Sequence, residues 1–306
     1  IDDNATSTAI TIDASENVTL TGTVNGLEIN TTATSNLGLG TGAVDSITTG
    51  DYNVGVGDGA LTANTTGANN TATGYHALYS NTTGAQNVAT GLQALYSNTT
   101  ASNNTANGYH ALFSNSTGSS NVAIGPWALR SNTTGDSNIV VGKEALYNNT
   151  TADNNVAVGY QALYSNTTGT QNVASGYQAL EKNTTANYNT ATGHQSLKAN
   201  TTGTSNTANG RVSLLSNTTG SNNTAVGLNS LYANTTGSNN TALGKAAGDN
   251  ITTGSSNIII GSSIDAPSAT ASNQLNIGGW ITGAAGAITV PGSLTTAGFT
   301  STGIDD

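Results

Sequence analysis

Small, apolar and polar residues recur along this chain with a period of 17 positions. Glycine occupies every seventeenth position from Gly40 to Gly278, without insertion or deletion. Asparagine lies four positions before these glycines from Asn36 to Asn257, and leucine lies four positions after them from Leu61 to Leu231. A fixed period predicts that equivalent residues stack on one another and that the chain grows along one axis as a solenoid.

Within one coil, the pattern separates a strand from a corner. Residues 155–159 alternate small and β-branched side chains, as strands do, and residues 165–169 have the composition of a turn. Alternation directs the Asn, Ala and Gly positions inward and the Val, Thr and Ile positions outward. At about 3.3 Å per residue, the contour of one coil holds two short strands and their corners but no wide cavity. The predicted fold class is an all-β, parallel β-solenoid of 17-residue coils.

Two further predictions concern what holds the coils together. The strand asparagine column, Asn36 to Asn257, is expected to form a ladder of side-chain amides between stacked strands. The leucine column, Leu61 to Leu231, is expected to fill the rest of the interior. Asn and Gly in the Asn-Thr-Thr-Gly corner are expected to supply the left-handed backbone conformations of the bend.

The chain divides into three zones, which are a β-rich flank or cap at 1–33, the repeat array at 34–278 and a second β-rich flank or connector at 279–306. Residues 9–12 and 287–290 alternate as strands do, and Pro291-Gly292 is a turn signal. We interpret the flanks as strands of capping modules or stalks. The chain begins and ends with Ile-Asp-Asp, which raises the hypothesis of one module in a longer tandem.

Composition narrows the function. Only 7% of the 306 residues are charged, the formal net charge is -10, and Lys and Arg together number 6. These 6 cationic side chains are too few to neutralise a phosphate backbone. No nucleic-acid partner is therefore expected. Cysteine is absent, so disulfides and thiolate chemistry are excluded. The longest apolar run in the repeats, at 258–260, is far shorter than a membrane span, so no membrane insertion is expected.

The repeats carry a resemblance to known families. Residues 121–125, and the larger motif at 223–227 followed by 234–237, resemble the head repeats of trimeric autotransporter adhesins and repeats of phage tail-fibre proteins. The resemblance covers roughly residues 34–278. It implies a left-handed parallel β-roll, a homotrimer, and a surface that binds host or matrix components. The coil differs from the adhesin heads in being longer, with an Asn-Thr-Thr-Gly corner.

One column of the repeat is rich in aromatic residues. The aromatic column, five positions after each glycine, comprises Tyr79, Tyr96, Phe113, Arg130, Tyr147, Tyr164, Glu181, Lys198, Leu215 and Tyr232. Because charges enter it, the column is not a dry core. It is either a half-exposed packing ladder or interface rim, or an aromatic strip that stacks on sugar rings. Trp127, beside Pro126, interrupts the repeat pattern. The candidate surface contacts are Trp127, Tyr79, Tyr96, Tyr147 and Tyr164, with a cell-surface glycan or host receptor as partner.

Asn-x-Thr triplets recur in the corner, and each matches an N-glycosylation acceptor. The candidate sites are Asn64, Asn81, Asn98, Asn132, Asn149 and Asn166, and the triplet also occurs at Asn115, Asn183, Asn200, Asn217 and Asn234. The alternative is that Asn-Thr-Thr-Gly simply makes the corner. Paired threonines, such as Thr82-Thr83 above Thr99-Thr100, raise a second alternative, which is ice binding by a threonine array.

No reaction, metal or cofactor is expected. His76 and His110 lie two coils apart, about 9.6 Å, so one metal cannot bridge them. Asp136 and Asp153 stack on successive coils, but a uniform coil offers no walled cleft for catalysis. The predicted function is a structural and adhesive fibre protein, a stiff rod that is extracellular, on the cell surface or part of a virion. The alternatives are a self-assembling extracellular filament and an ice-binding solenoid.

Overall fold

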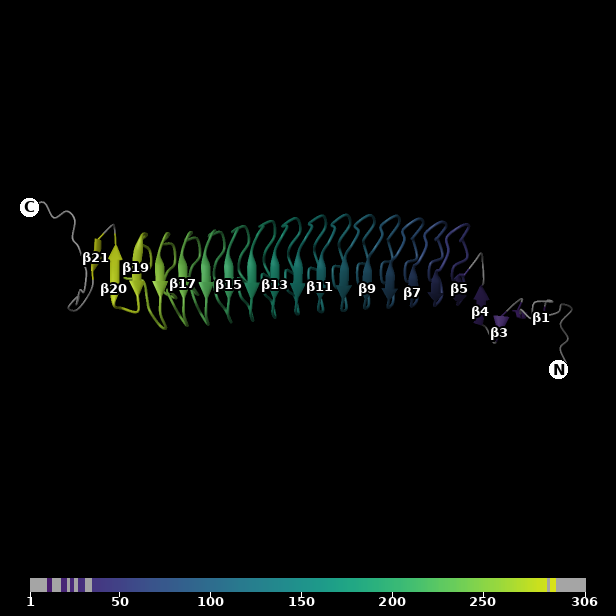
Figure 1. The fold of residues 1–306 in the computed structure, drawn as a ribbon, viewed down its shortest axis with the longest axis horizontal. Helices are drawn as coiled ribbons and strands as arrows, with labels where there is room; N and C mark the ends of the chain where they lie inside the picture. Colours follow the sequence, from purple (N-terminus) through teal and green to yellow (C-terminus); the bar gives the residue numbers. More distant parts are fainter. Residues whose placement is uncertain are drawn as a thin grey trace, which may run out of the picture.

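The computed structural model describes residues 10–12, 18–20, 23–24, 27–30, 35–284 and 287–289, and the repeats form a slender rod (Figure 1). The described residues contain strands and turns and no α-helix. The strands are β1 (Ile10–Ile12), β2 (Val18–Leu20), β3 (Thr23–Val24), β4 (Leu27–Asn30), β5 (Leu37–Leu39), β6 (Val54–Val56), β7 (Thr71–Thr73), β8 (Val88–Thr90), β9 (Thr105–Asn107), β10 (Val122–Ile124), β11 (Ile139–Val141), β12 (Val156–Val158), β13 (Val173–Ser175), β14 (Thr190–Thr192), β15 (Thr207–Asn209), β16 (Thr224–Val226), β17 (Thr241–Leu243), β18 (Ile258–Ile260), β19 (Gln274–Ile277), β20 (Ile281–Ala284) and β21 (Ala287–Thr289).

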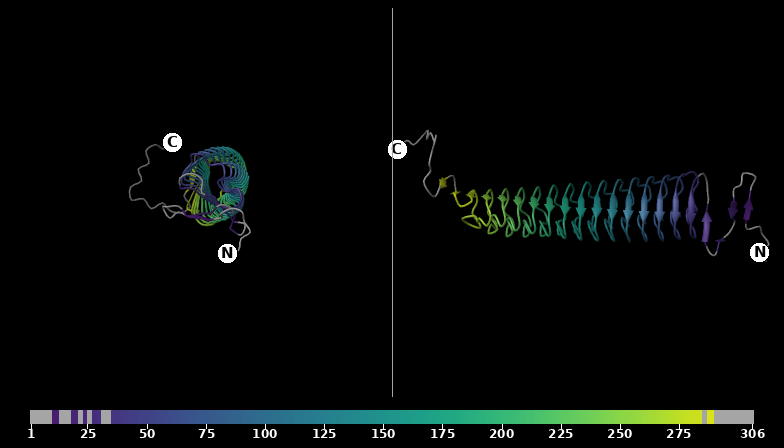
Figure 2. Two further views of the ribbon diagram at one scale, coloured as in Figure 1. Left: turned by 90° about the vertical axis from the view of Figure 1, so that its right-hand side faces the viewer. Right: turned by 60° about the horizontal axis from the view of Figure 1, so that its bottom comes forward.

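Strands β5 to β19 pair in parallel, each with the next strand in the sequence. Ala157 in β12, for example, pairs with Ala174 in β13, 17 positions later. The end-on view shows the coils lying over one another around a narrow interior (Figure 2). The prediction of a parallel β-solenoid with 17-residue coils is therefore confirmed.

Each coil from β5 to β18 has one three-residue strand, so the expectation of two strands per coil is wrong. The backbone turns left-handed soon after the strand, at Gln161 (φ 52°) and Leu163 (φ 53°) in the coil of β12. A strand requires consecutive extended residues, and such residues interrupt it. Hydrogen bonds between coils nevertheless continue through the turns, because the Leu163 amide donates to the Ala179 carbonyl at 3.0 Å.

The unexpected feature of this coil is a leucine with a left-handed backbone conformation. The conformation costs about 1–2 kcal/mol for a residue with a side chain. Every member of the leucine column is fully buried, as are the alanines two positions before each glycine, such as Ala157 and Ala174. Full burial of a leucine contributes about 1.5–3 kcal/mol, which offsets the strain. The predicted inward face of small residues and leucines is confirmed.

The repeat glycine is required by close approach of adjacent coils. Gly125 has φ 127°, and a Cβ there would lie 2.8 Å from the Gly142 carbonyl carbon. By contrast, the Asn-Thr-Thr-Gly corner at 166–169 contains no left-handed residue, so the expectation for that corner is wrong. The corner is held instead by side-chain hydrogen bonds.

The strand asparagine column forms the predicted ladder. The main-chain N–H of Asn172 donates to Asn155 Oδ1 at 2.9 Å, and the side-chain Nδ2 of Asn172 donates to the Ala186 carbonyl at 2.8 Å. Asn155 and Asn172 are fully buried. Burying amides is favourable only when their hydrogen bonds are satisfied, and here each coil satisfies its neighbour.

A second, unpredicted ladder runs through the corner asparagine column, Asn64 to Asn234. Asn149 Nδ2 donates to Asn132 Oδ1 at 2.8 Å and to the Ala152 carbonyl at 3.0 Å. Isoleucines, Ile47 and Ile251, occupy the same position in the coils beyond its two ends. Asn234 Oδ1 is consequently buried without a hydrogen-bond partner.

In the coil after this ladder, the interior volume is filled by different residues. Gly248 stands where the leucine column would continue, and the Cγ1 atom of Ile259 lies 3.3 Å from where a Cβ on this glycine would be. Ile251 Cδ1 lies 3.2 Å from the same point. Two larger side chains therefore fill the space of the missing leucine.

At both ends of the array the pairing becomes antiparallel. Strand β4 pairs with β5 through Ile29 and Leu39, β20 pairs with β19 through Ile281 and Ile277, and β21 pairs with β20. The predicted boundaries at 33/34 and 278/279 fall between these antiparallel pairs. The end strands cover main-chain groups that a bare coil would expose for pairing. The turn predicted at Pro291-Gly292 lies outside the described residues.

Candidate functional site

Two surfaces of the rod vary from coil to coil, and the first is the outward strand face. It consists of the first and third residues of each strand from β5 to β18, such as Val156 and Val158 on either side of the buried Ala157, together with Leu275 and Ile277 of β19. Large apolar side chains stand exposed on it, with 48% of Ile139 and 49% of Leu243 accessible.

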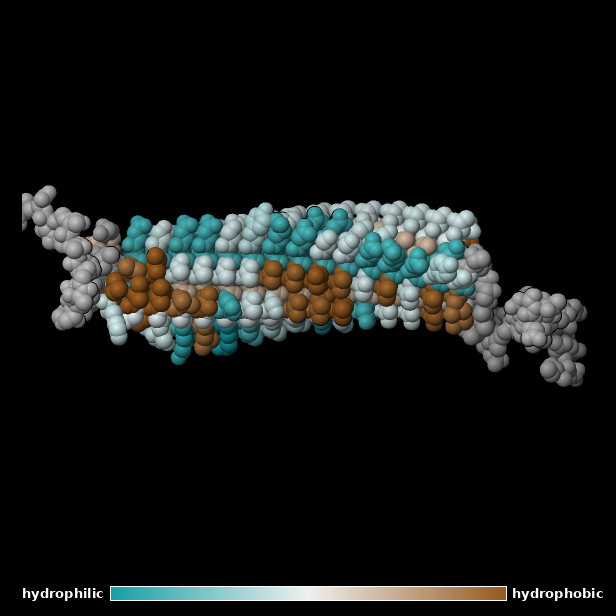
Figure 3. Space-filling model, viewed as in Figure 1, coloured by the Kyte–Doolittle hydropathy of each residue, from teal (hydrophilic) through white to brown (hydrophobic). Residues whose placement is uncertain are grey.

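Apolar and polar coils alternate along this face (Figure 3). The all-apolar coils carry Leu37, Leu39, Val54 and Val56 near one end, Val122, Ile124, Ile139, Val141, Val156 and Val158 in the middle, and Ile258, Ile260, Leu275 and Ile277 near the other end. The all-polar coils between them carry Thr71, Thr73, Thr105, Asn107, Thr190, Thr192, Thr207 and Asn209. The face is therefore a narrow sheet strip with apolar patches separated by hydroxyl and amide groups.

The second surface contains the aromatic column, whose rings stack in one continuous series. Tyr79 and Tyr96 are parallel within 4° with centroids 5.2 Å apart, and Tyr96 stacks on Phe113 at the same distance. Tyr147 stacks on Tyr164 at 5.3 Å. These rings are half-buried, as expected for a packing ladder.

Arg130 joins the two halves of this stack. Its Cζ lies 5.5 Å from the Phe113 centroid on one side and 5.5 Å from the Tyr147 centroid on the other. A guanidinium between two aromatic faces is favourable because its positive charge meets the negative face of each ring. The charge that interrupts the column in the sequence therefore continues the stack in the structure.

A surface hollow of about 390 Å³ opens beside Arg130. Its lining comprises Tyr109, His110, Trp127, Arg130, Glu144, Tyr147 and Tyr164. Of the candidate contacts, Trp127, Tyr147 and Tyr164 meet here, whereas Tyr79 and Tyr96 line no part of it. The volume falls within the range of about 300–1,000 Å³ common for ligand sites.

Sequence reasoning did not single out Tyr109, His110 or Glu144 as members of a site. These residues lie one and two positions after the repeat glycine. Because the turn after the strand is tight, those positions come close to the aromatic column of neighbouring coils. The signal that could have found them is the aromatic residue shared by Tyr75, Tyr109, Tyr160 and Tyr177 one position after glycine.

Rings and charges hold the hollow's walls in place. Trp127 meets Tyr109 edge to face, with centroids 5.4 Å apart and an interplanar angle of 86°. Lys143 Nζ lies 5.4 Å from the Trp127 centroid and 3.6 Å from Glu144 Oε1. Glu144 Oε2 accepts a hydrogen bond from Gln161 at 2.8 Å, so the carboxylate is engaged on both oxygens.

His110 faces Arg130 as an uncharged ring. Its Nε2 lies 2.7 Å from Gln93 Oε1, which requires the proton on Nε2. Burial, and secondly the charge of Arg130, lower the pKa of His110 from 6.5. Burial is also the main cause that raises the pKa of Tyr164 above 10.0, so this phenol stays protonated.

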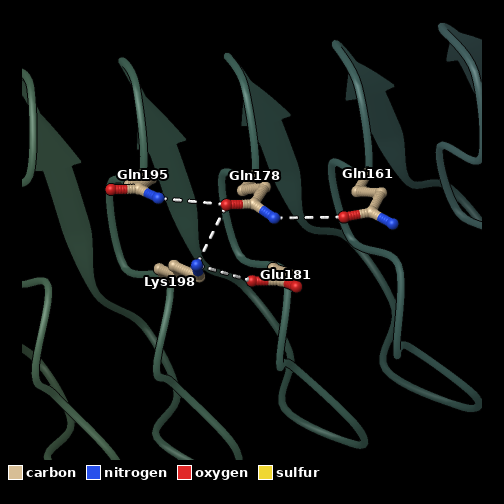
Figure 4. Close-up of polar contacts among 5 residues, drawn as sticks. All are labelled: Gln161, Gln178, Glu181, Gln195 and Lys198. Atoms are coloured by element: carbon tan, nitrogen blue, oxygen red, sulfur yellow. Dashed lines mark hydrogen bonds and ion pairs between the residues drawn. The ribbon is translucent and has the colours of Figure 1, made fainter.

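Beyond Tyr164 the surface changes to a polar network (Figure 4). Gln195 Nε2 donates to Gln178 Oε1 at 3.0 Å, and Gln178 Nε2 donates to Gln161 Oε1 at 3.1 Å. Lys198 Nζ lies 3.2 Å from Glu181 Oε2 and 2.9 Å from Gln178 Oε1. The charged and amide groups of these coils therefore satisfy one another.

The triplet asparagines lie inside the coil rather than on an edge. All of the corner asparagine column is fully buried, and each Nδ2 donates to a main-chain carbonyl of its own corner. The geometry thus supports the corner-forming alternative, because a glycosyl group could reach these nitrogens only if the coil opened. Glycosylation stays a prediction to be tested.

The paired threonines do not form an array of free hydroxyl groups. The first threonine of each pair is tied to the next coil, as Thr82 Oγ1 donates to the Thr99 carbonyl at 3.0 Å. The second, such as Thr83, is exposed. Only one of the two hydroxyl columns is therefore free, which weakens the case for a two-dimensional ice-binding lattice.

The stacked aspartates cap backbone groups. Asp153 Oδ1 accepts the Asp136 amide at 2.7 Å, and Asp136 Oδ1 accepts the Ser119 amide at 2.6 Å. No group of three His, Asp or Glu side chains suited to a metal occurs in the described part of the chain. Nor does any helix there have the length and apolarity to cross a membrane.

Comparison with protein-family models, with curated proteins and with solved structures finds nothing that matches this chain. The fold is therefore established by the stacked coils themselves, and the resemblance to adhesin heads and tail fibres stays an expectation.

Proposed function

We propose that this chain is a structural and adhesive fibre protein, the shaft or head of an extracellular or virion rod. The observation that carries the proposal is the outward strand face. Its apolar patches expose isoleucine, valine and leucine side chains on adjacent coils, and large exposed apolar patches usually mark association surfaces. In this proposal copies of the chain associate side by side, as a homotrimer of left-handed rolls.

The alternation of coils on this face supports parallel, in-register association. Aligned copies place Ile139 and Val141 against the same residues of their neighbours, and Thr190 and Thr192 against theirs. A shift of three coils would set valine and isoleucine against threonine and asparagine, which leaves polar groups unpaired. The capped ends favour such lateral association over the alternative of an endless end-to-end filament.

Adhesion follows from repetition in this proposal. One exposed aromatic or polar group binds weakly, but a rod that presents it on many coils and several copies binds by avidity. The receptor is a cell-surface glycan or host protein, and the location is outside the cell or on a virion.

Sedimentation of the full chain tests the assembly. We expect the native protein to sediment as a trimer and Ile139→Asp with Val141→Asp to sediment as a monomer, because the aspartates would bury charge at the interface. The matched control, Thr134→Asp with Thr151→Asp, adds the same charge to exposed corner positions and should stay trimeric. A native monomer at micromolar concentration contradicts the proposal, and open-ended filaments in negative stain favour the alternative.

A further inference from the structure

The most unusual group on the rod is Arg130, a half-buried cation held by rings rather than by an anion. Phe113 and Tyr147 occupy its two faces. Within the described residues the two salt bridges are Lys143 with Glu144 and Lys198 with Glu181, and neither includes Arg130. Its edge of N–H donors therefore has no acceptor from the protein.

The other charges near the hollow are already partnered. Lys143 and Gln161 engage Glu144, and Glu181 and Gln178 engage Lys198. Burial, and secondly the charge of Arg130, lower the pKa of His110, which disfavours a charged imidazole here. Arg130 is consequently the uncompensated charge among the residues that line the hollow.

Aromatic surfaces surround this cation. Trp127 and Tyr109 stand edge to face on one side, and Tyr147 and Tyr164 stack on the other. These residues come from four successive coils, so the hollow extends over three inter-coil spacings, about 14 Å. That length accommodates a short chain of sugar rings. Tyr147 is covered on one face by Arg130 and on the other by Tyr164, so phenol edges and hydroxyl groups, with the indole of Trp127, line the hollow.

We infer that this hollow binds a carboxylate-bearing saccharide, with the acid group on Arg130 and the sugar rings on Trp127 and the neighbouring tyrosines. Arginine matches a carboxylate because its fork of donors can form two parallel hydrogen bonds. The inference rests on the proposed function, since it assigns the chemical class of ligand to the adhesive surface. It also gives a role to an unpaired arginine beside Trp127 in a chain of net charge -10.

Trigalacturonate and its methyl ester form a matched pair of probes, because esterification removes the charge and leaves the rings unchanged. The readout is tryptophan fluorescence in a Trp280→Phe background, where Trp127 is the remaining tryptophan. Trp280 is 80% exposed and lies outside the hollow. We expect the acid to bind about tenfold or more tightly than the ester, given the strength of hydrogen bonds between charged groups.

Variants of Arg130 locate the effect. Arg130→Gln should lose about tenfold or more in affinity for the acid and nothing for the ester, and Arg130→Lys should fall between, because it keeps the charge but not the fork. The control Arg211→Gln removes an exposed arginine outside the hollow and should leave both affinities unchanged.

Two outcomes overturn the inference. Equal binding of acid and ester shows a neutral-sugar site, and binding of neither shows that the hollow is not a saccharide site. The fibre proposal is decided separately by sedimentation, which needs no ligand. If Arg130→Gln fails to fold, the acid and ester pair still gives a decision on the native chain.

Discussion

From one coil to the next, the interior columns repeat almost without change while the exterior columns change chemical class. The strand asparagine column is unbroken from Asn36 to Asn257, whereas the aromatic column passes from tyrosine through arginine to glutamate and lysine. Inside, each side chain touches its own copies above and below, so a different volume or polarity disturbs three coils. Outside, a side chain needs only a compatible neighbour, and stacking or ion pairing supplies one.

The comparison teaches where function can vary on a solenoid. Stability comes from columns that must be uniform, and recognition comes from the columns that are free to differ. The hollow beside Arg130 arises from a local run of exterior residues on an interior that differs little from that of other coils, as in Val140 for the usual alanine.

The largest effect is expected when an interior alanine is enlarged. Ala174→Phe places a ring in a fully buried column that neighbouring alanines fill, and should cost about 3 kcal/mol or more through overpacking. The control Thr168→Phe, on the exposed corner of the same coil, should change the thermal midpoint little. Equal midpoints for Ala174→Phe and the native chain would contradict the assignment of inside and outside.

Breaking the corner ladder should have the next largest effect. Asn149→Ala removes the donor to Asn132 Oδ1, and an unpaired buried acceptor costs about 1–3 kcal/mol. The exposed Asn209→Ala serves as control. The urea midpoint of unfolding measures the stability of both variants. A smaller loss of stability for Asn149→Ala than for Asn209→Ala would show that the ladder is not a stabilising element.

Extending the same ladder should stabilise the rod. Gly248→Leu, Ile251→Asn and Ile259→Ala together convert an atypical coil to the common pattern and supply a donor to Asn234 Oδ1. The Oδ1 atom that Ile251→Asn introduces has Ser268 at the next position of its column, whose hydroxyl is the donor it needs, so one added hydrogen bond is expected to contribute about 1 kcal/mol. Ile251→Asn alone should destabilise, since it removes apolar volume beside Gly248. A triple variant that melts lower than the native chain would contradict this account of volume exchange.

The pH dependence linked to His110 should be smaller. Because the pKa of His110 is lower in the folded chain than in the unfolded chain, the unfolded chain binds the proton first as the pH falls. The contribution of the neutral imidazole to stability is therefore complete above pH 6.5 and declines below it. Arg130→Gln removes one of the two causes, and the NMR titration midpoint of His110 should move upward. An unchanged midpoint would show that the arginine charge does not reach the ring.

No change is expected in the final test. Secreted from a host with N-glycosylation machinery, the chain should keep the mass of its unmodified sequence, because the corner nitrogens are buried in folded coils. Intact-mass spectrometry decides this, with a peptide of one isolated corner as the accessible control. Added hexose along the chain would show that modification precedes folding.

The architecture of the rod could be predicted from the 17-residue period alone. A period without slippage fixes which residues stack, so the solenoid, the strand asparagine ladder and the inward leucines all follow from counting. It also placed Tyr147, Tyr164 and Trp127 on the outside, because varied positions are not interior ones.

The turns of the coil and the meeting of particular exterior residues emerge from the folded chain and could not be predicted from the repeat. Leu163 and its equivalents adopt a left-handed conformation because inter-coil hydrogen bonds and burial outweigh a local preference, and propensity cannot anticipate this. Asn149 has the residue pattern of a glycosylation acceptor, yet its surroundings make it a core amide. Arg130, His110 and Glu144 come together because the turn folds two columns onto one surface, a distance relation that the linear repeat does not contain.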